Sequence, residues 1–191
     1  MPRYRFERVD KRISPEEARA IINSILLDDI KAIVSLLYLT GARVSEVLAL
    51  TPYSARIDKT EVEISIPNLK LRGDKKQKYG AFVPSRTLVF NRTGKTKWFM
   101  DHVIRHINRC RKLETKKLFE FNRFKVWYEL KKASEIVSPH SFRHSRLQTL
   151  ADKGATQHQI RAFAGHSRME SSTAYIEGSR EQTQKVKEMI E

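Results

Sequence analysis

The spacing of apolar residues predicts helices in the first quarter of the chain. Ser14-Pro15-Glu16-Glu17 has the form of a capping box with proline at the first helical position, and apolar residues then recur at helical spacing as far as Ile25. A second helix is predicted from Asp28-Asp29 to about Gly41. A third runs from about residue 45 to residue 50, where Thr51-Pro52 ends it.

Between residues 55 and 89 the period changes to that of strands. Val62, Ile64 and Ile66 alternate with polar residues, which predicts a half-buried strand. Residues 73–76 have turn chemistry, and a return strand is predicted at residues 79–84. This region therefore predicts a small antiparallel sheet with a basic hairpin tip.

Residues 96–135 return to helical spacing. One helix contains Trp98 and Ile107, and a second contains Phe119, Phe124 and Trp127. These aromatic residues stand among lysines and arginines, so stacking on nucleic-acid bases is one interpretation. We favour the other, in which they belong to the core.

Three further helices are predicted towards the C-terminus. One begins at Ser138-Pro139 and carries His140, Arg143 and His144 on one face. Another covers residues 155–164 and is closed by Gly165, and a short one lies around 172–176. We expect an α+β fold that is mainly α-helical: a basic lead-in over 1–13, one domain over 14–178 and a polar, helical tail over 179–191.

The charge of the chain is concentrated in one segment. The net charge is +15, and residues 67–132 hold nineteen Lys and Arg against five Asp and Glu. A localised cationic surface favours a polyanion, and we expect double-stranded DNA as the partner. A membrane surface is the alternative, but no long basic amphipathic helix stands out, and the longest apolar stretch is too short to span a bilayer. The single cysteine, Cys110, excludes intrachain disulfides and cysteine-based zinc sites, which fits the cytoplasm and its nucleoid.

A set of residues suited to phosphodiester chemistry follows. His140, Arg143, His166 and Tyr175 fall within thirty-six residues, and Arg43 stands at the head of an earlier helix. A phenol has a pKa of about 10 and needs neighbouring cations to attack at neutral pH. Arginine forks match phosphate geometry, and histidines transfer protons. Each residue alone also has an ordinary interpretation, such as a surface charge or a packed tyrosine.

The ordered motifs resemble one family. Thr40-Gly41-x-Arg43-x-x-Glu46-x-x-x-Leu50 is followed by His140-x-x-Arg143, by Gly165-His166 and by Tyr175. The steps of twenty-three residues from Arg143 to His166 and of nine from His166 to Tyr175 also match. Over residues 14–176 the chain is similar to the tyrosine recombinase (phage integrase) family, whose catalytic domain has the DNA breaking-rejoining enzyme fold.

The resemblance implies roles for these residues. Tyr175 would attack the scissile phosphate and form a 3′-phosphotyrosine, with Arg43 and Arg143 on the phosphate. His140 would assist proton transfer, His166 would hydrogen-bond the phosphate, and Glu46 would support the first arginine. No metal, ATP or other cofactor is implied. The lysine that protonates the leaving oxygen is assigned to Lys70 in preference to Lys75 or Lys76, and the residues left over would contact DNA: Arg72, Lys75, Lys76 and Lys78.

The resemblance also implies a site-specific recombinase of a mobile element, acting as a tetramer on two DNA sites and monomeric off DNA. The tail over 179–191 is either exchanged between protomers or folds back, and Tyr175 acts in its own site or a neighbour's. The family's N-terminal core-binding domain is expected to be absent, so the chain is either an excised domain or a minimal enzyme. Two rival functions are a type IB topoisomerase and a non-catalytic DNA-binding protein with a helix-turn-helix over residues 156–176.

Overall fold

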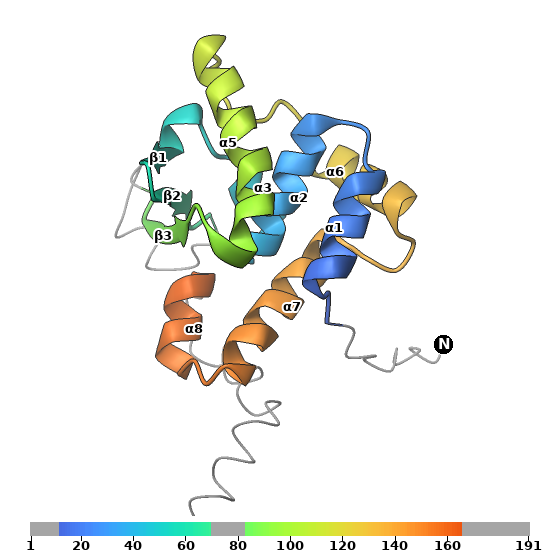
Figure 1. Ribbon diagram of the computed structural model, residues 1–191, viewed down its shortest axis with the longest axis vertical. Coiled ribbons are helices and arrows are strands. Elements are labelled where there is room, and N and C mark those ends of the chain that lie inside the picture. Colours follow the sequence, from blue (N-terminus) through green and yellow to red (C-terminus); the bar gives the residue numbers. More distant parts are fainter. Residues whose placement is uncertain (1–11, 70–82, 166–191) are drawn as a thin grey trace, which may run out of the picture.

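A local capping signal begins the first helix where the sequence predicts it. The structure is a computed structural model that describes residues 12–69 and 83–165 (Figure 1). Helix α1 (Pro15–Ser24) begins at Ser14, whose hydroxyl accepts the Glu17 N–H at 3.1 Å while the Glu17 carboxylate accepts the Ser14 N–H at 2.9 Å. Helix α2 (Asp28–Thr40) ends at Gly41, and the short helix α3 (Val44–Leu48) follows at once. The three predicted N-terminal helices are therefore confirmed.

Helix α2 is the centre of the core. Nine of its thirteen residues are buried, and it packs against α1, α5 (Lys97–Lys112) and α7 (Pro139–Asp152) (Figure 1). Ile33 and Leu36 of α2, Phe99 of α5 and Phe142 of α7 are among the largest fully buried side chains. Burial of each such side chain contributes about 1.5–3 kcal/mol. The helices that carry the candidate residues are thus fixed by one shared apolar core.

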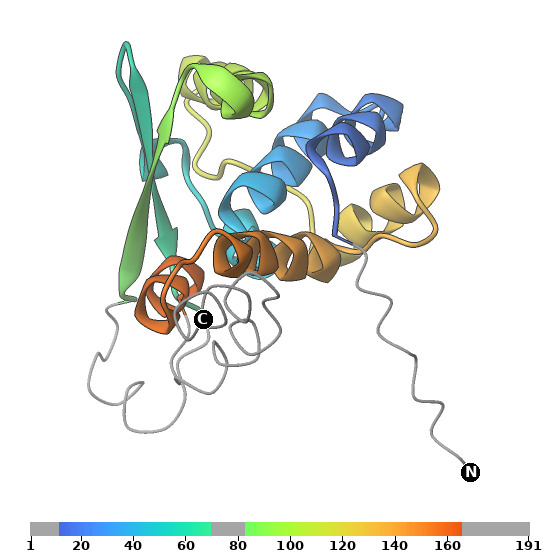
Figure 2. The ribbon, with the colours of Figure 1, turned by 60° about the horizontal axis from the view of Figure 1, so that its bottom comes forward.

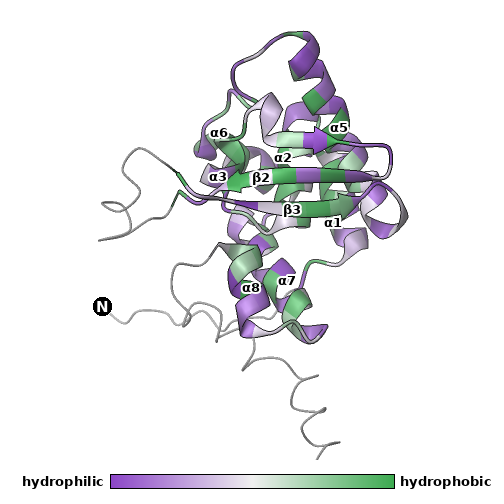
Figure 3. Ribbon diagram, turned by 90° about the vertical axis from the view of Figure 1, so that its left-hand side faces the viewer, coloured by the Kyte–Doolittle hydropathy of each residue, from purple (hydrophilic) through white to green (hydrophobic). Residues whose placement is uncertain are grey.

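A three-stranded antiparallel sheet lies beside the helices. A 3-10 turn (Pro52–Ser54) leads into β1 (Ala55–Ile57), which pairs with β2 (Glu61–Pro67), and β2 pairs with β3 (Ser85–Asn91). Val62, Ile64 and Ile66 are buried and alternate with more exposed polar residues. The helices lie on one side of the sheet (Figures 2 and 3). The predicted mainly helical α+β fold with a small antiparallel sheet is confirmed.

The return strand lies later in the chain than predicted. We expected it at residues 79–84, but Val83 and Pro84 precede β3, and residues 79–82 are outside the described part. The register decides the position, because Ser85 pairs with Pro67 and Asn91 pairs with Glu61. The apolar residues that match the buried face of β2 are therefore Leu88 and Phe90.

Helix α6 (Arg123–Ala133) turns two aromatic side chains towards solvent. Phe119, which precedes α6, is buried as predicted. Phe124 is 67% exposed and Trp127 is 43% exposed, so their assignment to the core was wrong. The reason is that α6 packs through Val126 and Leu130, one turn apart on another face.

The last described helices match their start and stop signals. Helix α7 begins after Ser138, whose hydroxyl accepts the Ser141 N–H, and α8 (Gln157–Ala164) ends at Gly165 in the left-handed conformation with φ +62°. A second 3-10 turn (Gly94–Thr96) precedes α5. No helix within 12–69 or 83–165 is both long and apolar enough to cross a membrane. Residues 1–11 of the lead-in predicted over 1–13, and the helices predicted at 172–176 and 179–191, lie outside the described residues.

Candidate active site

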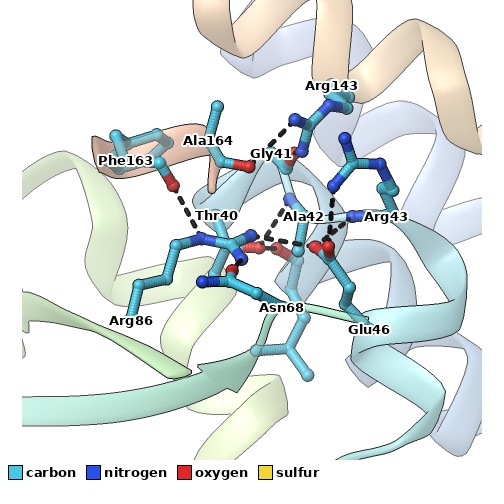
Figure 4. Close-up of polar contacts among 11 residues, drawn as sticks. Thr40, Gly41, Ala42, Arg43, Glu46, Asn68, Arg86, Arg143, Phe163 and Ala164 are labelled. Atoms are coloured by element: carbon cyan, nitrogen blue, oxygen red, sulfur yellow. Dashed lines mark hydrogen bonds and ion pairs between the residues drawn. The ribbon is translucent and has the colours of Figure 1, made fainter. Parts of the chain in front are cut away.

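The turn between α2 and α3 positions Arg43. The Thr40 hydroxyl donates to the Leu36 carbonyl at 2.6 Å and accepts the Ala42 N–H at 3.1 Å. Gly41 adopts φ +57°, a conformation that glycine tolerates best. The chain therefore turns sharply within Gly41 and Ala42, and Arg43 becomes the residue that precedes α3 (Figure 4).

Arg143 is buried in the same region. It is only 3% exposed, and its Nη1 donates to the Gly41 carbonyl at 2.7 Å while its Nη2 donates to the Ala164 carbonyl at 2.9 Å (Figure 4). Those two carbonyls belong to the C-terminal ends of α2 and α8, where backbone acceptors lack helical partners. Arg143 thus joins three helices and lies beside the turn that carries Arg43.

Glu46 is fully buried and shared by two arginines. Its Oε1 accepts Nη1 of Arg43 at 2.8 Å, and its Oε2 accepts the Arg43 backbone N–H at 3.0 Å and Nη2 of Arg86 at 2.9 Å. Burial alone would raise the pKa of the Glu46 carboxyl, but the charge of Arg86 and these hydrogen bonds outweigh it and hold the pKa below its usual value. Glu46 is therefore ionised, and it holds Arg43 in place while it also binds Arg86. Its role goes beyond a simple ion pair with Arg43 along helix α3.

Arg86 of β3 is a site residue that the sequence reasoning missed. Its Nε donates to the Phe163 carbonyl at 2.8 Å, its Nη1 to Oδ1 of Asn68 at 2.6 Å and its Nη2 to Glu46 (Figure 4). Arg86 is 9% exposed, and it ties β3 to α3, to α8 and to the end of β2. One signal could have found it, because Arg86 occupies an inward position in the same alternation as Leu88 and Phe90. A charge at such a position requires a buried partner.

Gly165 lies against this arginine. A Cβ atom at residue 165 would come within 2.3 Å of Oδ1 of Asn68 and 2.6 Å of Nη1 of Arg86. Only glycine fits there, both for space and for its left-handed φ. Arg86 therefore borders two chain segments that lead to predicted residues, since Gly165 precedes His166 and Asn68 stands two positions before Lys70.

The two α7 histidines are exposed next to the buried Arg143. The rings of His140 and His144 are 4.3 Å apart between centroids and perpendicular to each other. Arg43, His140 and Arg143 line one cavity of about 540 Å³. The remaining residues that line it come from the starts of α3, α6 and α7: Ala42, Val44, Ser45, Arg123, Phe124, Trp127, Ser138 and Pro139.

The described structure thus gathers four of the predicted residues: Arg43, Glu46, His140 and Arg143. Two guanidinium groups and an imidazole around one cavity can bind a phosphate and exchange protons with its oxygens. The other predicted residues lie outside the described residues: Lys70, Arg72, Lys75, Lys76, Lys78, His166 and Tyr175.

The solved structures with the same fold include three recombinase structures. XerH site-specific recombinase bound to its difH substrate before cleavage has a TM-score of 0.62 at 16% identity, over 84% of this chain and 48% of that one. XerH in its post-cleavage complex with palindromic difH has a TM-score of 0.67 at 14% identity, over 93% and 53%. XerA recombinase has a TM-score of 0.63 at 20% identity, over 97% and 65%. The chain therefore spans about half to two thirds of the length of these proteins.

Sequence comparison gives a family but no individual relative. No curated protein matches the chain significantly. The family model described as "Phage integrase family" matches residues 11–182, which include every motif quoted above. The chain belongs to the phage integrase family of tyrosine recombinases.

Proposed function

We propose that this chain is the catalytic domain of a site-specific DNA recombinase that cleaves and rejoins strands through a covalent 3′-phosphotyrosine. The observation that carries the proposal is the convergence of Arg43, His140 and Arg143 on one cavity, with Glu46 buried behind Arg43. The family membership and the basic segment over residues 67–132 support DNA as the substrate.

The arginines would act on the phosphate. Arg43 is 26% exposed at its side chain, and Glu46 contacts one nitrogen of its guanidinium, Nη1. A guanidinium has five N–H donors, so Arg43 keeps N–H groups that can donate hydrogen bonds to phosphate oxygens. Arg143 is held rigidly by two carbonyls and adds fixed positive charge beside the same cavity. Preorganised charge of this kind stabilises a transition state in which negative charge builds up on the phosphate oxygens.

The reaction would proceed in two reversible steps. The Tyr175 oxygen attacks phosphorus, its proton passes through His140, and the bond from phosphorus to the 5′ oxygen breaks. Lys70, with Lys75 and Lys76 as alternatives, donates the proton that the leaving 5′ oxygen takes up, and His166 hydrogen-bonds the phosphate. A 5′ hydroxyl of another strand then attacks the phosphotyrosine, so the proposal needs neither ATP nor a metal. Strand exchange between two sites would involve four protomers.

Trapping on nicked DNA tests the proposal. A nick placed just downstream of the cleaved phosphate lets the short 5′-hydroxyl product diffuse away, so the covalent intermediate accumulates. A pool of such duplexes with randomised sequence around the nick should give a slower-migrating protein band after denaturation. Tyr175→Phe should abolish the band while DNA affinity is retained. DNA binding without a band in the unsubstituted protein would contradict the proposal and favour a non-catalytic DNA-binding protein.

A further inference from the structure

Helix α6 carries an exposed aromatic surface. Phe124 and Trp127 are 67% and 43% exposed, and their rings stack on each other with centroids 6.0 Å apart. They lie near the N-terminal end of α6, where Arg123 is the first helical residue. Two large, mutually stacked aromatic rings that remain in contact with water indicate a ligand-binding surface.

This aromatic surface forms one wall of the cavity that holds the candidate phosphate site. Phe124 and Trp127 line it together with Arg43, His140 and Arg143. The arrangement follows from packing, because α6 contacts both α3 and α7, whose starts carry the other lining residues. One cavity therefore joins an aromatic wall to a cationic wall.

The chemistry of the two walls specifies a ligand that is both aromatic and anionic. Three arginines line the cavity and, among the described residues that line it, none has a carboxylate. Flat aromatic rings accept the face of a nucleobase whatever its identity, and arginine forks accept phosphate oxygens. A nucleotide unit of a DNA strand has both parts. A segment of a second protein copy would need apolar side chains with acidic ones, as in Glu188-Met189-Ile190-Glu191, and this occupant is an outcome of the test below.

We propose that this cavity holds one nucleotide of the DNA strand, with its phosphate at Arg43 and Arg143 and its base unstacked from the duplex and lying against Phe124 and Trp127. This deepens the proposed function, on which it rests, by assigning the aromatic wall to the nucleotide next to the cleaved phosphate. Phe124 and Trp127 would then bind substrate, and they would hold open the base step at which the strand is cut.

Intrinsic fluorescence can test the proposal, because the chain has two tryptophans, Trp98 and Trp127. Trp98→Phe leaves Trp127 as the only tryptophan, and Trp98 lies in α5 outside the cavity. The probes are a short oligothymidylate and an abasic oligomer of equal length, which carries the same phosphates without bases. We expect oligothymidylate to quench the Trp127 emission and the abasic oligomer to leave it unchanged, while the polarisation of labelled probes shows that both bind.

Matched variants in the Trp98→Phe background separate stacking from charge. Phe124→Ala should weaken oligothymidylate binding by about 5- to 150-fold, the range for loss of one base–aromatic stack, and leave abasic binding unchanged. Arg43→Ala should weaken both probes alike. Tyr53→Ala is the control, since Tyr53 is 78% exposed and does not line the cavity, and it should change neither. Unfolding in urea checks that the variants fold.

Two outcomes would overturn the inference. One is equal quenching by both probes, or binding of both without quenching, because the bases would then not reach Trp127. The other is a change of Trp127 emission with protein concentration in the absence of DNA, which would show that a second copy of the chain occupies the cavity. Neither outcome depends on Tyr175. Base stacking can therefore be absent from a protein that forms the covalent adduct, and base stacking can be present in a protein that forms no adduct.

Discussion

Replacement of Arg86 by methionine tests the buried charge cluster behind the candidate site. The change keeps a long apolar side chain but removes three hydrogen bonds, to the Phe163 carbonyl, to Asn68 and to the carboxylate of Glu46. Glu46 is fully buried, so losing one of its two guanidinium partners leaves its charge only partly compensated.

The size of the effect follows from these contacts. Breaking a buried ion pair by removing one partner costs about 3–5 kcal/mol. Because Arg43 still contacts Glu46, we expect a value at the lower end, about 3 kcal/mol. Domains of this size have a free energy of unfolding of about 5–15 kcal/mol in total. The variant should therefore still fold, but with a much lower free energy of unfolding.

Urea denaturation at neutral pH measures this loss. Arg86→Met should lower the midpoint without changing the slope, and Arg86→Lys should lose less because it keeps the charge. Arg105→Met is the control, since Arg105 is exposed, and it should stay within about 0.5 kcal/mol of the unsubstituted protein. In the double variant Glu46→Gln/Arg86→Met, the cost should be smaller than the sum of the two single costs. A loss below about 1 kcal/mol for Arg86→Met, or strict additivity in the double variant, would refute the reasoning.

Three further predictions concern a glycine, a carboxyl group and the basic segment. Gly165→Ala should destabilise more than Gly94→Ala in the same urea assay, because both positions have positive φ but only residue 165 would clash with Asn68 and Arg86, and equal losses would contradict this. The pKa of Glu46 is lowered in the folded state, so the stability that its ionised carboxylate contributes is present above the ordinary pKa of 4.5 and is lost as the pH falls further. The difference in unfolding free energy between the unsubstituted protein and Glu46→Gln should therefore shrink on acidification below about pH 4.5. A difference that stays constant with pH would argue against this reasoning. The affinity for double-stranded DNA should fall steeply as salt rises if several lysines and arginines of residues 67–132 contact phosphates, and an affinity that does not change across a salt titration would contradict DNA binding by this segment.

The helix boundaries could be predicted because their signals are local. Ser14-Pro15 and Ser138-Pro139 begin helices through contacts with residues three positions later, and Gly165 ends one through its own φ. Such contacts depend little on the rest of the fold. The strand alternation through Val62, Ile64 and Ile66 was equally clear, since its period alone identifies the buried face.

The features that sequence reasoning missed depend on contacts between distant segments. Nothing near Arg86 in the chain shows that its partners come from α3, α8 and the end of β2. The aromatic residues of α6 were misassigned because helical spacing identifies an apolar face but not which face meets a neighbour, and α6 uses Val126 and Leu130. The position of β3 was set by its pairing with β2 rather than by its own composition.

The chemical identity of the covalent adduct tests the central claim most directly. After trapping on the nicked-duplex pool, nuclease digestion should leave a nucleotide remnant on the protein, and peptide mass spectrometry locates it. The account predicts that the remnant is joined through a 3′ phosphate to Tyr175 and that the released strand has a 5′ hydroxyl. A remnant on another residue, or one joined through a 5′ phosphate, would contradict it.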